Sequence, residues 1–519
     1  MAVLQSGRWR LENLARRLPS PAVLGVIGSA LIALGSFGAG ATRNRGGLLE
    51  ALDLEFLTFG HGAGMSAAVL WVGILVLLLS WVLLGRSAVV DSPADDAART
   101  ATVRRSLVAW VTPLVVAAPI LSRDVYSYLM QGAMIRDGFD PYSEGAAVNP
   151  GPYLLEVSHD WRNTTTPYGP LHLWMGSGVT GVVGDNVAAG LIVYKLISLA
   201  GFTAIAWAVP RIARRLGGDP AMALWLGVAN PVMVLHLVGG MHNESVMVGL
   251  VSVGLLACLR RRFILGTALI AVAVALKATA AIALPFVVWM ATNHYAGDRP
   301  TWARRAVAFV ATGAAGVAVT LAVISAVTWL SGSSWGWLQE ISGNSKVINP
   351  LAGPTLLTEL TLPFIQLFAP SFDYNVLLGV FRPLGTVLML TGLVVVWWLF
   401  RQDDRRAVMG TTLAYQVAFM TNSVTLPWYY ASVVSLAGTF TPPRWVLKLT
   451  VGASVFLTLS FEGSGNHQLY NLAWVAASLI LAWVLTVYVF PLDAHLRPGL
   501  DRGGDAAPGT ERPASVTAP

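Results

Sequence analysis

The segment from residue 122 to 132, with the sequence SRDVYSYLMQG, contains the residue best suited to acid–base chemistry, Asp124. An apolar run over about residues 105–121 precedes it and is close to the length of a membrane span. The segment opens a polar loop that reaches about residue 186. A carboxylate at the mouth of a membrane helix can accept a proton from a polar substrate beside the bilayer.

The spacing of the polar residues that follow indicates a helix. Asp124, Tyr128 and Gln131 stand at i, i+4 and i+7, so on a helix they share one face. Another face is apolar and carries Val125, Leu129 and Gly132. We therefore expect an amphipathic helix at the membrane surface, with its polar face toward a sugar and its apolar face toward lipid. The alternative is that Asp124 only caps this helix, a common position for aspartate.

The rest of the polar loop is more acidic than basic, and its aromatic side chains offer stacking surfaces for a glycan. Two segments stand out, residues 137–142 (DGFDPY) and 164–170 (TTTPYGP). Besides Tyr128 and Gln131, the loop residues that we expect to bind substrates are Arg123, Tyr126, Asp137, Asp140 and Tyr168.

A second polar cluster, His242-Asn243-Glu244, interrupts an apolar stretch on the same predicted outer side. Polar residues within a membrane are costly, which favours a functional role. A helix-hairpin turn capped by Asn243 explains the cluster equally well, and the two readings are compatible. His242 with Glu244 is a weak metal motif, because no second His or Cys cluster lies nearby.

Cations and aromatic residues complete the candidate substrate-binding set. Lys277 ends a short predicted span and Arg382 lies just inside another, where each could hold a phosphate or only reach toward water. Lys346 belongs to a second polar loop, which could close over the site or be plain loop. An aromatic run at the outer surface could line the site or belong to an interfacial belt: Trp428, Tyr429 and Tyr430.

The composition is that of a membrane protein, so membrane helices must position these residues. Hydrophobic residues make up 55% of the chain and charged residues only 12%, about half of the charged fraction of soluble domains. Only helices satisfy their own backbone groups in apolar blocks of this length, and no alternating β-barrel pattern is present. A single cysteine, Cys258, excludes an intramolecular disulfide.

We predict an all-α polytopic bundle of about 14 spans, each near the length that a bilayer requires. The predicted spans cover residues 22–41, 63–84, 105–121, 187–209, 221–239, 245–259, 263–277, 279–292, 306–330, 376–400, 408–424, 429–441, 446–460 and 471–490. The pairs around 263–292 and 408–441 are short enough to be re-entrant or broken helices.

The distribution of basic residues predicts the orientation. Most of the 34 Lys and Arg residues fall in short loops and termini on one side of the bundle. The positive-inside rule then places both termini in the cytoplasm, and the loops at about 122–186 and 331–375 outside. We expect a cytoplasmic segment 1–21, a membrane domain 22–490 and a disordered tail 491–519. No exposed basic domain is present, so a nucleic-acid partner is not expected.

Together the motifs resemble those of the actinobacterial α-(1→6)-mannopyranosyltransferases, GT-C glycosyltransferases that use polyprenyl-phosphate mannose. The resemblance covers about residues 22–490 and rests on the order and spacing of six motifs: Ser122-Arg123-Asp124 with Tyr126 and Tyr128, Asp137-Gly138 with Asp140-Pro141-Tyr142, Pro167-Tyr168-Gly169-Pro170, His242-Asn243-Glu244, Lys277-Ala278-Thr279 and Leu426-Pro427-Trp428-Tyr429-Tyr430. Residues 59–62 (FGHG) and 184–186 (GDN) are most similar to the member called mannosyltransferase A, which extends the mannan backbone of lipomannan and lipoarabinomannan.

The resemblance implies a GT-C bundle in the plasma membrane whose active site lies on the extracytoplasmic face. The donor is expected to be a β-linked mannosyl phosphate on decaprenol, and the acceptor a lipid-anchored mannan that gains an α-(1→6)-linked mannose. That outcome is inversion by a single displacement, in which Asp124 accepts the proton of the acceptor 6-hydroxyl. The departing phosphate is expected to be stabilised by Lys277 and Arg382, with Arg123 and His242 behind them.

The same resemblance implies that the prenyl tail lies in an apolar groove between helices. No cofactor and no metal are expected, since basic residues can handle a lipid-phosphate leaving group. Two other functions stay open. A transporter or lipid flippase fits the intramembrane charges, although no internal repeat is visible and the polar residues gather on one face. A polyprenyl-phosphate-sugar transferase with another sugar or a protein acceptor also fits.

Overall fold

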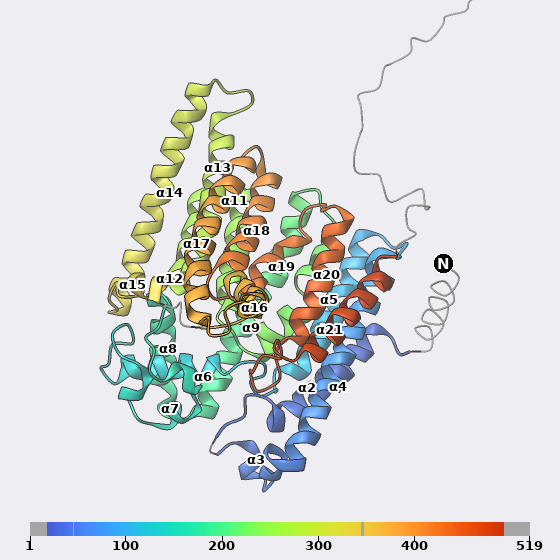
Figure 1. Cartoon of the computed structure of the whole chain (residues 1–519). Coiled ribbons are helices and arrows are strands. Elements are labelled where there is room, and N and C mark those ends of the chain that lie inside the picture. Colours follow the sequence, from blue (N-terminus) through green and yellow to red (C-terminus); the bar gives the residue numbers. More distant parts are fainter. Residues whose placement is uncertain (1–17, 45, 344–346, 492–519) are drawn as a thin grey trace, which may run out of the picture.

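The computed structural model describes residues 18–491, apart from Arg45 and residues 344–346. Lys346 and the predictions for residues 1–17 and 492–519 therefore lie outside the described residues. Within the described part the chain is helical, and strand pairing is limited to one bridge between Phe461 and His467. The predicted all-α fold class is confirmed (Figure 1).

The helices form a bundle with a group of short helices at one end (Figure 1). The first part of the chain forms α2 (Pro21–Ala39), α3 (Leu48–Ala51), η1 (Glu55–Thr58), α4 (Gly60–Leu84), η2 (Gly85–Val90) and α5 (Asp96–Leu114). The first polar loop forms α6 (Asp124–Arg136), η3 (Ala146–Val148), α7 (Pro152–Glu156), η4 (His159–Trp161) and α8 (Pro170–Val183).

The middle part of the chain follows. It contains α9 (Val187–Arg215), α10 (Pro220–Gly227), the π-helix η5 (Met233–Gly239), α11 (Glu244–Leu259), α12 (Phe263–Leu276), η6 (Ala278–Ala283), α13 (Leu284–Ala296) and α14 (Trp302–Ser331). The last part contains α15 (Trp337–Gly343), α16 (Gly353–Gln366), α17 (Tyr374–Leu399), α18 (Asp404–Thr421), η8 (Pro427–Tyr430), α19 (Ala431–Ala437), α20 (Arg444–Leu459) and α21 (Leu472–Val489).

Six helical stretches in the described chain are long and apolar enough to cross a membrane: Pro21–Ala39, Gly60–Val90, Val187–Arg215, Trp302–Ser331, Tyr374–Leu399 and Leu472–Val489. A seventh results if η5 and α11, which are bent by 117°, form one broken span. The remaining predicted spans fall on helices that are shorter or more polar. Length and composition therefore give fewer spans than predicted, while the polytopic membrane class is confirmed.

The predicted span over residues 221–239 is not one helix. It divides into α10 and η5, because Pro231 lacks the backbone N–H that a continuous helix needs. Asn230 fills the gap: its side chain donates to the carbonyl of Leu226 at 3.0 Å and accepts from the amide of Val232 at 3.0 Å. The proline was a visible signal for this break.

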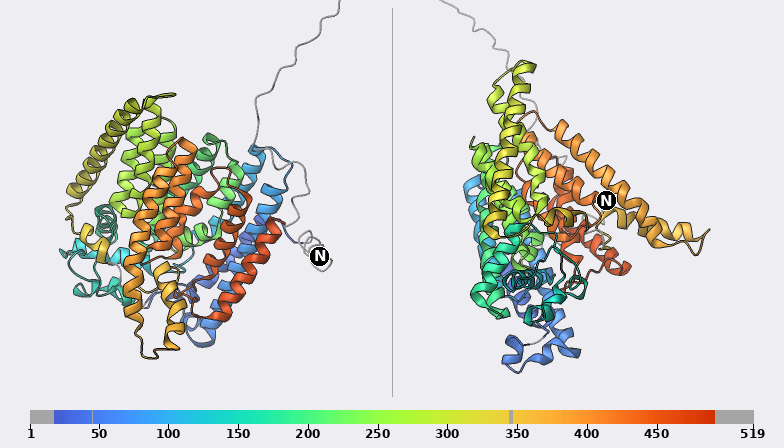
Figure 2. Two further views of the ribbon diagram at one scale, coloured as in Figure 1. Left: turned by 45° about the horizontal axis from the view of Figure 1, so that its top comes forward. Right: turned by 90° about the vertical axis from the view of Figure 1, so that its left-hand side faces the viewer.

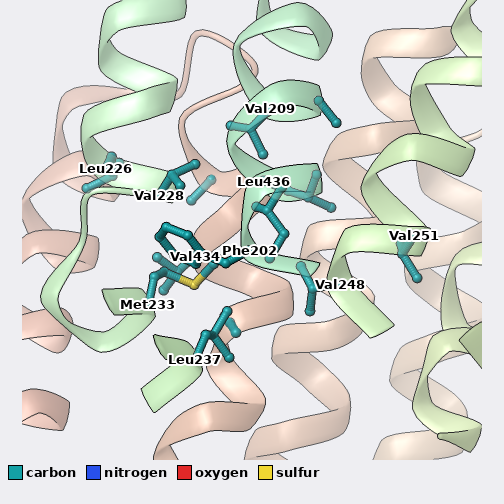
Figure 3. Close-up of a cluster of buried hydrophobic side chains, with 14 of the residues drawn as sticks. Phe202, Val209, Leu226, Val228, Met233, Leu237, Val248, Val251, Val434 and Leu436 are labelled. Carbon is teal, nitrogen blue, oxygen red and sulfur yellow. The ribbon is translucent and has the colours of Figure 1, made fainter. Parts of the chain in front are cut away.

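One part of the main hydrophobic core lies where α9, α10, η5, α11 and α19 meet (Figure 3). Side chains from these five elements interdigitate there, including Phe202, Leu226, Met233, Val248 and Leu436. At the periphery, α14 and α17 leave most of their apolar side chains exposed, and Figure 2 shows both helices on the outside of the bundle. Apolar surfaces of this kind are suited to lipid.

The predicted surface position of the Asp124 helix is wrong. α6 is a buried helix that packs closely on α8, with Gly132 against the backbone of Gly176. Any larger residue at Gly132 would collide with that backbone. The face expected to contact lipid is also buried, since Val125 and Leu129 are both inaccessible to solvent. Long-range packing by α8, α9 and α7 covers both faces of the helix.

Candidate active site

Asp124 is placed by a short segment that leaves α5. The chain runs from the end of α5 to Leu121, which has a left-handed backbone with φ of 64°. The amide of Leu121 donates to the carbonyl of Gly463 at 2.8 Å, so the loop between α20 and α21 holds this turn. α6 then begins at Asp124 itself, and its cap position is Arg123, which makes no side-chain cap bond. The capping alternative for Asp124 is therefore wrong.

The imidazole of His242 faces the carboxylate of Asp124. Nδ1 of His242 lies 3.4 Å from Oδ2 of Asp124, and the His242 side chain is fully buried while that of Asp124 is 15% exposed. His242 follows Met241, a second non-glycine residue with a left-handed backbone, at φ of 55°. The indole of Trp428 stacks on the His242 ring with centroids 3.8 Å apart.

Trp428 is 3% exposed. Its ring also meets the ring of Phe461 edge-on, with centroids 5.9 Å apart. It therefore lies inside the protein, and the interfacial-belt reading of this residue is wrong. Tyr429 and Tyr430 follow it in η8 and are half-buried.

The environment of Asp124 favours the ionised carboxylate. Burial raises its pKa, but the interaction with His242, the Ser122 hydroxyl and the charge of Lys277 lower it more, so the pKa lies below its usual value. Tyr128, one turn along α6, has its hydroxyl 3.5 Å from Oδ2. A carboxylate that is ionised at neutral pH can act as a proton acceptor.

Lys277 and Glu244 form a buried ion pair beside Asp124. Lys277 stands at the break between α12 and η6, in an extended conformation that frees its side chain from the helix. Its ammonium lies 4.1 Å from the ring centre of Tyr429 and 5.4 Å from that of Tyr168. The second carboxylate oxygen of Glu244, Oε2, is buried without a hydrogen-bond partner among the described residues.

Gly169 explains how the 164–170 segment reaches this ion pair. Its amide donates to the carbonyl of Leu276 at 3.0 Å, and its Cα lies against the carbonyl of Ala275. A side chain at residue 169 would collide with that backbone, so only glycine permits the approach. The close contact carries the neighbouring Tyr168 to Lys277.

His172 joins the two predicted polar clusters. Its Nε2 donates to Oε1 of Gln131 at 2.9 Å, and its Nδ1 accepts from Nδ2 of Asn243 at 3.4 Å. Burial, with the charge of Lys277, lowers the pKa of His172 to about 3, so the ring is neutral at physiological pH. The ring also packs edge-on against Tyr128, with centroids 4.8 Å apart.

Two residues of this site were missed in the sequence, His172 and His236. His236 lies 5.8 Å from the His242 ring and 5.6 Å from that of Trp428, and both of its ring nitrogens are buried without a hydrogen-bond partner in the described structure. An ionisable residue inside an apolar run was available as a signal for His236. His172 gave no comparable signal, because its partners are distant in sequence.

Arg123 and Tyr126 face away from Asp124. Arg123 pairs with Glu156 at 3.0 Å and donates to the carbonyl of Thr42 at 2.8 Å. The hydroxyl of Tyr126 donates to the carbonyl of Ala41 at 2.8 Å. These contacts are all with the protein, and they tie α6 to α7 and to the end of α2.

Three further predicted residues are not brought to Asp124 by any contact in the described structure. Arg136 lowers the pKa of Asp137 by a hydrogen bond at the exposed surface. Asp140 accepts from the amide of Tyr142 in a loop turn. Arg382, on α17, donates to the carbonyl of Val347 at 3.1 Å. No group of three or more His, Cys, Asp or Glu side chains that could hold a metal occurs among the described residues.

Two protein families match this chain, one over its N-terminal part and one over its C-terminal part. Residues 22–293 match a family described as α-(1→6)-mannopyranosyltransferase, N-terminal domain. Residues 354–490 match a second family described as MptB C-terminal domain. Asp124, His242 and Lys277 belong to the first region and Trp428 to the second, so the site draws on both.

Individual relatives carry the same family name. α-(1→6)-Mannopyranosyltransferase A of Corynebacterium glutamicum is 61% identical over 471 residues, covering 89% of this chain and 96% of that protein. The Mycobacterium tuberculosis protein of the same name is 38% identical over 470 residues, covering 89% of each chain. α-(1→6)-Mannopyranosyltransferase B of C. glutamicum is 30% identical over 458 residues, covering 81% and 73%. The chain therefore belongs to the α-(1→6)-mannopyranosyltransferase family and is a membrane glycosyltransferase of its A type.

Proposed function

We propose that the protein transfers mannose from polyprenyl-phosphate mannose to the 6-hydroxyl of a lipid-anchored mannan acceptor. The product linkage is α-(1→6), in the backbone of lipomannan and lipoarabinomannan, and it forms by inverting single displacement. The observation that carries the proposal is the Asp124–His242 pair beside the Lys277–Glu244 pair in one buried cluster. The names of the relatives support the sugar and the linkage.

Asp124 is the base in this proposal. Its lowered pKa keeps it ionised in the donor-free protein, but a weakly basic carboxylate is a poor proton acceptor. An anionic donor phosphate bound nearby raises the pKa of a carboxylate by like-charge repulsion. Donor binding therefore moves Asp124 toward the basicity that it needs when the acceptor hydroxyl attacks. The gain from such a base is about 10²–10⁴-fold.

Lys277 is the residue proposed to stabilise the leaving phosphate, together with His242, which faces Asp124. Both are buried, so their interaction with a phosphate is only weakly screened by water. Glu244 already neutralises Lys277. The phosphate therefore has to share Lys277 with Glu244. The unpaired oxygen of Glu244, Oε2, is then able to accept a hydrogen bond from a hydroxyl of the sugar. Arg382 and Arg123 have protein partners and support this step less directly.

The polyprenyl tail is proposed to lie in an apolar groove of about 940 Å³ between α12, η6, α13, α14 and α17. One end of the groove is lined by Ala281 and Ile282, which follow Lys277 in η6. The other end reaches Phe263 and Tyr295 near the opposite side of the bundle. Because Ala281 and Ile282 follow Lys277 closely in sequence, the groove starts near a cation, and this combination suits a prenyl phosphate.

We also propose that the site lies on the extracytoplasmic face of the plasma membrane, with both termini in the cytoplasm. The basic residues at the ends of the bundle support this orientation through the positive-inside rule. Arg211, Arg260 and Arg304 lie at one end of α9, α11 and α14, and the site lies at the other end of these helices.

The test is transfer by the purified protein in lipid nanodiscs. Radiolabelled decaprenyl-phosphate mannose and a short α-(1→6)-dimannoside are supplied to the wild type, to Asp124→Asn and to Asp160→Asn. Asp160 is a matched control, because it is a carboxylate of the same loop whose side chain is 62% exposed. We expect an α-(1→6)-linked labelled trisaccharide from the wild type and from Asp160→Asn, and a loss of about 10²–10⁴-fold in Asp124→Asn.

Equal rates in all three proteins would remove Asp124 from the mechanism. Label in a different linkage would overturn the proposed product. No transfer by folded wild-type protein, together with movement of the labelled lipid between leaflets, would favour the transporter reading.

A further inference from the structure

Lys195 is a buried cation that the proposed reaction does not use. It lies on α9, and the residue is only 5% exposed. Its acceptors are three main-chain carbonyls, with Nζ 3.3 Å from the oxygen of Leu114, 2.8 Å from that of Val238 and 3.5 Å from that of Gly239. Burying an ammonium costs free energy unless its N–H groups find hydrogen-bond acceptors. The three carbonyls supply these acceptors, so the side chain is held at a defined position.

The three carbonyls belong to the ends of two helices. Leu114 is the last residue of α5, and Val238 and Gly239 are the last two residues of η5. The final carbonyls of a helix have no partner within it and carry partial negative charge. A single ammonium therefore satisfies two helix ends at once and fixes the distance between them.

Both helix ends lead directly to the candidate active site. The chain continues from Leu114 through residues 115–123 to Asp124, and from Gly239 to His242. The two segments also touch, since the backbone of Gly240 lies against the carbonyl of Ile120.

Each segment contains a left-handed non-glycine residue, Leu121 in the first and Met241 in the second. Such backbones persist only where the surroundings hold them in place. The strain therefore calls for an anchor on both segments, and Lys195 contacts the start of each. Ser198, one turn further along α9, adds a bond to the carbonyl of Leu237.

We propose that Lys195 is a positioning residue: its ammonium clamps the ends of α5 and η5 together and thereby sets the distance between Asp124 and His242. The proposal rests on the proposed function for its catalytic readout. Lys195 contacts neither of these two side chains and acts through the backbone that carries them.

The experiment compares Lys195→Met and Lys195→Arg with the wild type, using full-length protein in nanodiscs. Methionine keeps the volume but removes the donors, and arginine keeps the charge and the donors. Ile205→Ala is the matched control, because Ile205 is fully buried on the same helix and contacts neither helix end through a hydrogen bond. The measured quantities are kcat, the donor KM and the pH dependence of kcat/KM.

We expect Lys195→Met to lower kcat by about 100-fold, the scale of a misplaced catalytic group, while the donor KM changes less than about twofold. The acid limb of kcat/KM should move to higher pH, because Asp124 loses the interaction with His242 that offsets its burial. Lys195→Arg should restore part of kcat. Ile205→Ala should melt at lower temperature without moving the acid limb.

Hydrogen–deuterium exchange gives a readout that does not depend on transfer. In Lys195→Met, exchange should rise in peptides covering residues 115–123 and 236–243, and not in α2 or α20. If the wild type shows no mannosyl transfer, the proposed function is overturned. The hydrogen–deuterium exchange of the two segments still tests whether Lys195 clamps them. Unchanged exchange in both segments, or an unchanged acid limb, overturns the clamp. If Lys195→Met cannot be recovered, Lys195→Leu, which also lacks donors, replaces it in both comparisons.

Discussion

Arg123 and Asp124 are neighbours in the chain, but their side chains lie in two different regions of the protein with different polar contacts. Arg123 turns toward α7, where Glu156 and main-chain carbonyls use its guanidinium. Asp124 turns toward a polar cluster whose groups are incompletely satisfied, including Nε2 of His242 and Oε2 of Glu244. The protein uses every part of the Arg123 guanidinium, whereas the buried groups around Asp124 keep bonding capacity that is available to a bound substrate.

The largest effect on transfer is expected from neutralising the ion pair beside Asp124. Lys277→Gln leaves Glu244 charged and buried, so we expect lower thermal stability together with a loss in kcat/KM for the donor of about 100-fold. The double variant Lys277→Gln/Glu244→Gln removes both charges and should recover stability without recovering transfer. Transfer assays and thermal unfolding on the two proteins separate these effects. Recovery of transfer in the double variant would make the pair purely structural.

A smaller effect is expected from His242→Gln, and it should depend on pH. The groups nearest Asp124 include His242, the Ser122 hydroxyl, Lys277 and Tyr128. The side chains of Tyr168, His172 and Tyr429 are also close enough to interact with its charge. Burial raises the pKa of Asp124, and His242 supplies the largest opposing contribution. Its removal should therefore raise that pKa and move the acid limb of kcat/KM to higher pH.

Because the proposed base, Asp124, is deprotonated above its pKa, His242→Gln should lose most at acid pH and regain activity as the pH rises. A pH profile of donor kcat/KM measures this directly. A uniform loss at every pH would show that His242 contributes by contact with substrate and not through Asp124. Trp428→Phe, which keeps an aromatic ring over residue 242, is a useful control for the stack.

The smallest effect on transfer is expected at Arg123. Arg123→Met leaves Glu156, which is 1% exposed, without its closest cation, and should cost about 1–3 kcal/mol of stability. Turnover per folded molecule should change less than about twofold. Arg136→Met is the matched control, because its pairs with Asp137 and Asp185 are partly exposed and should cost only about 0–1 kcal/mol. A large loss of turnover in folded Arg123→Met would blur the distinction between scaffold and site.

Residue types and local spacing were enough to predict the helical membrane class and the polar clusters at Asp124 and His242. They were not enough to predict how α6 is buried. The i, i+4, i+7 pattern describes one helix alone, whereas the close approach at Gly132 depends on α8, which folds onto it from a distant part of the chain. The predicted contact with lipid failed for that reason.

The candidate site shows the same limit. The charge of Lys277 makes it a candidate in the sequence, but nothing local indicates that Glu244 neutralises it or that Tyr168 lies beside it. Lys195 and His172 also act through partners that are far away in sequence. Pro231 is the opposite case, since its effect on α10 is local and follows from its missing N–H.

The bond between Leu121 and Gly463 has a consequence for the order of events during synthesis. A ribosome delivers Asp124, His242 and Lys277 to the membrane well before Trp428 and the loop after α20. Until that last loop arrives, Leu121 lacks the carbonyl that holds its turn, and the His242 ring lacks its cover. The proposed site is therefore assembled only when nearly the whole polypeptide has been made.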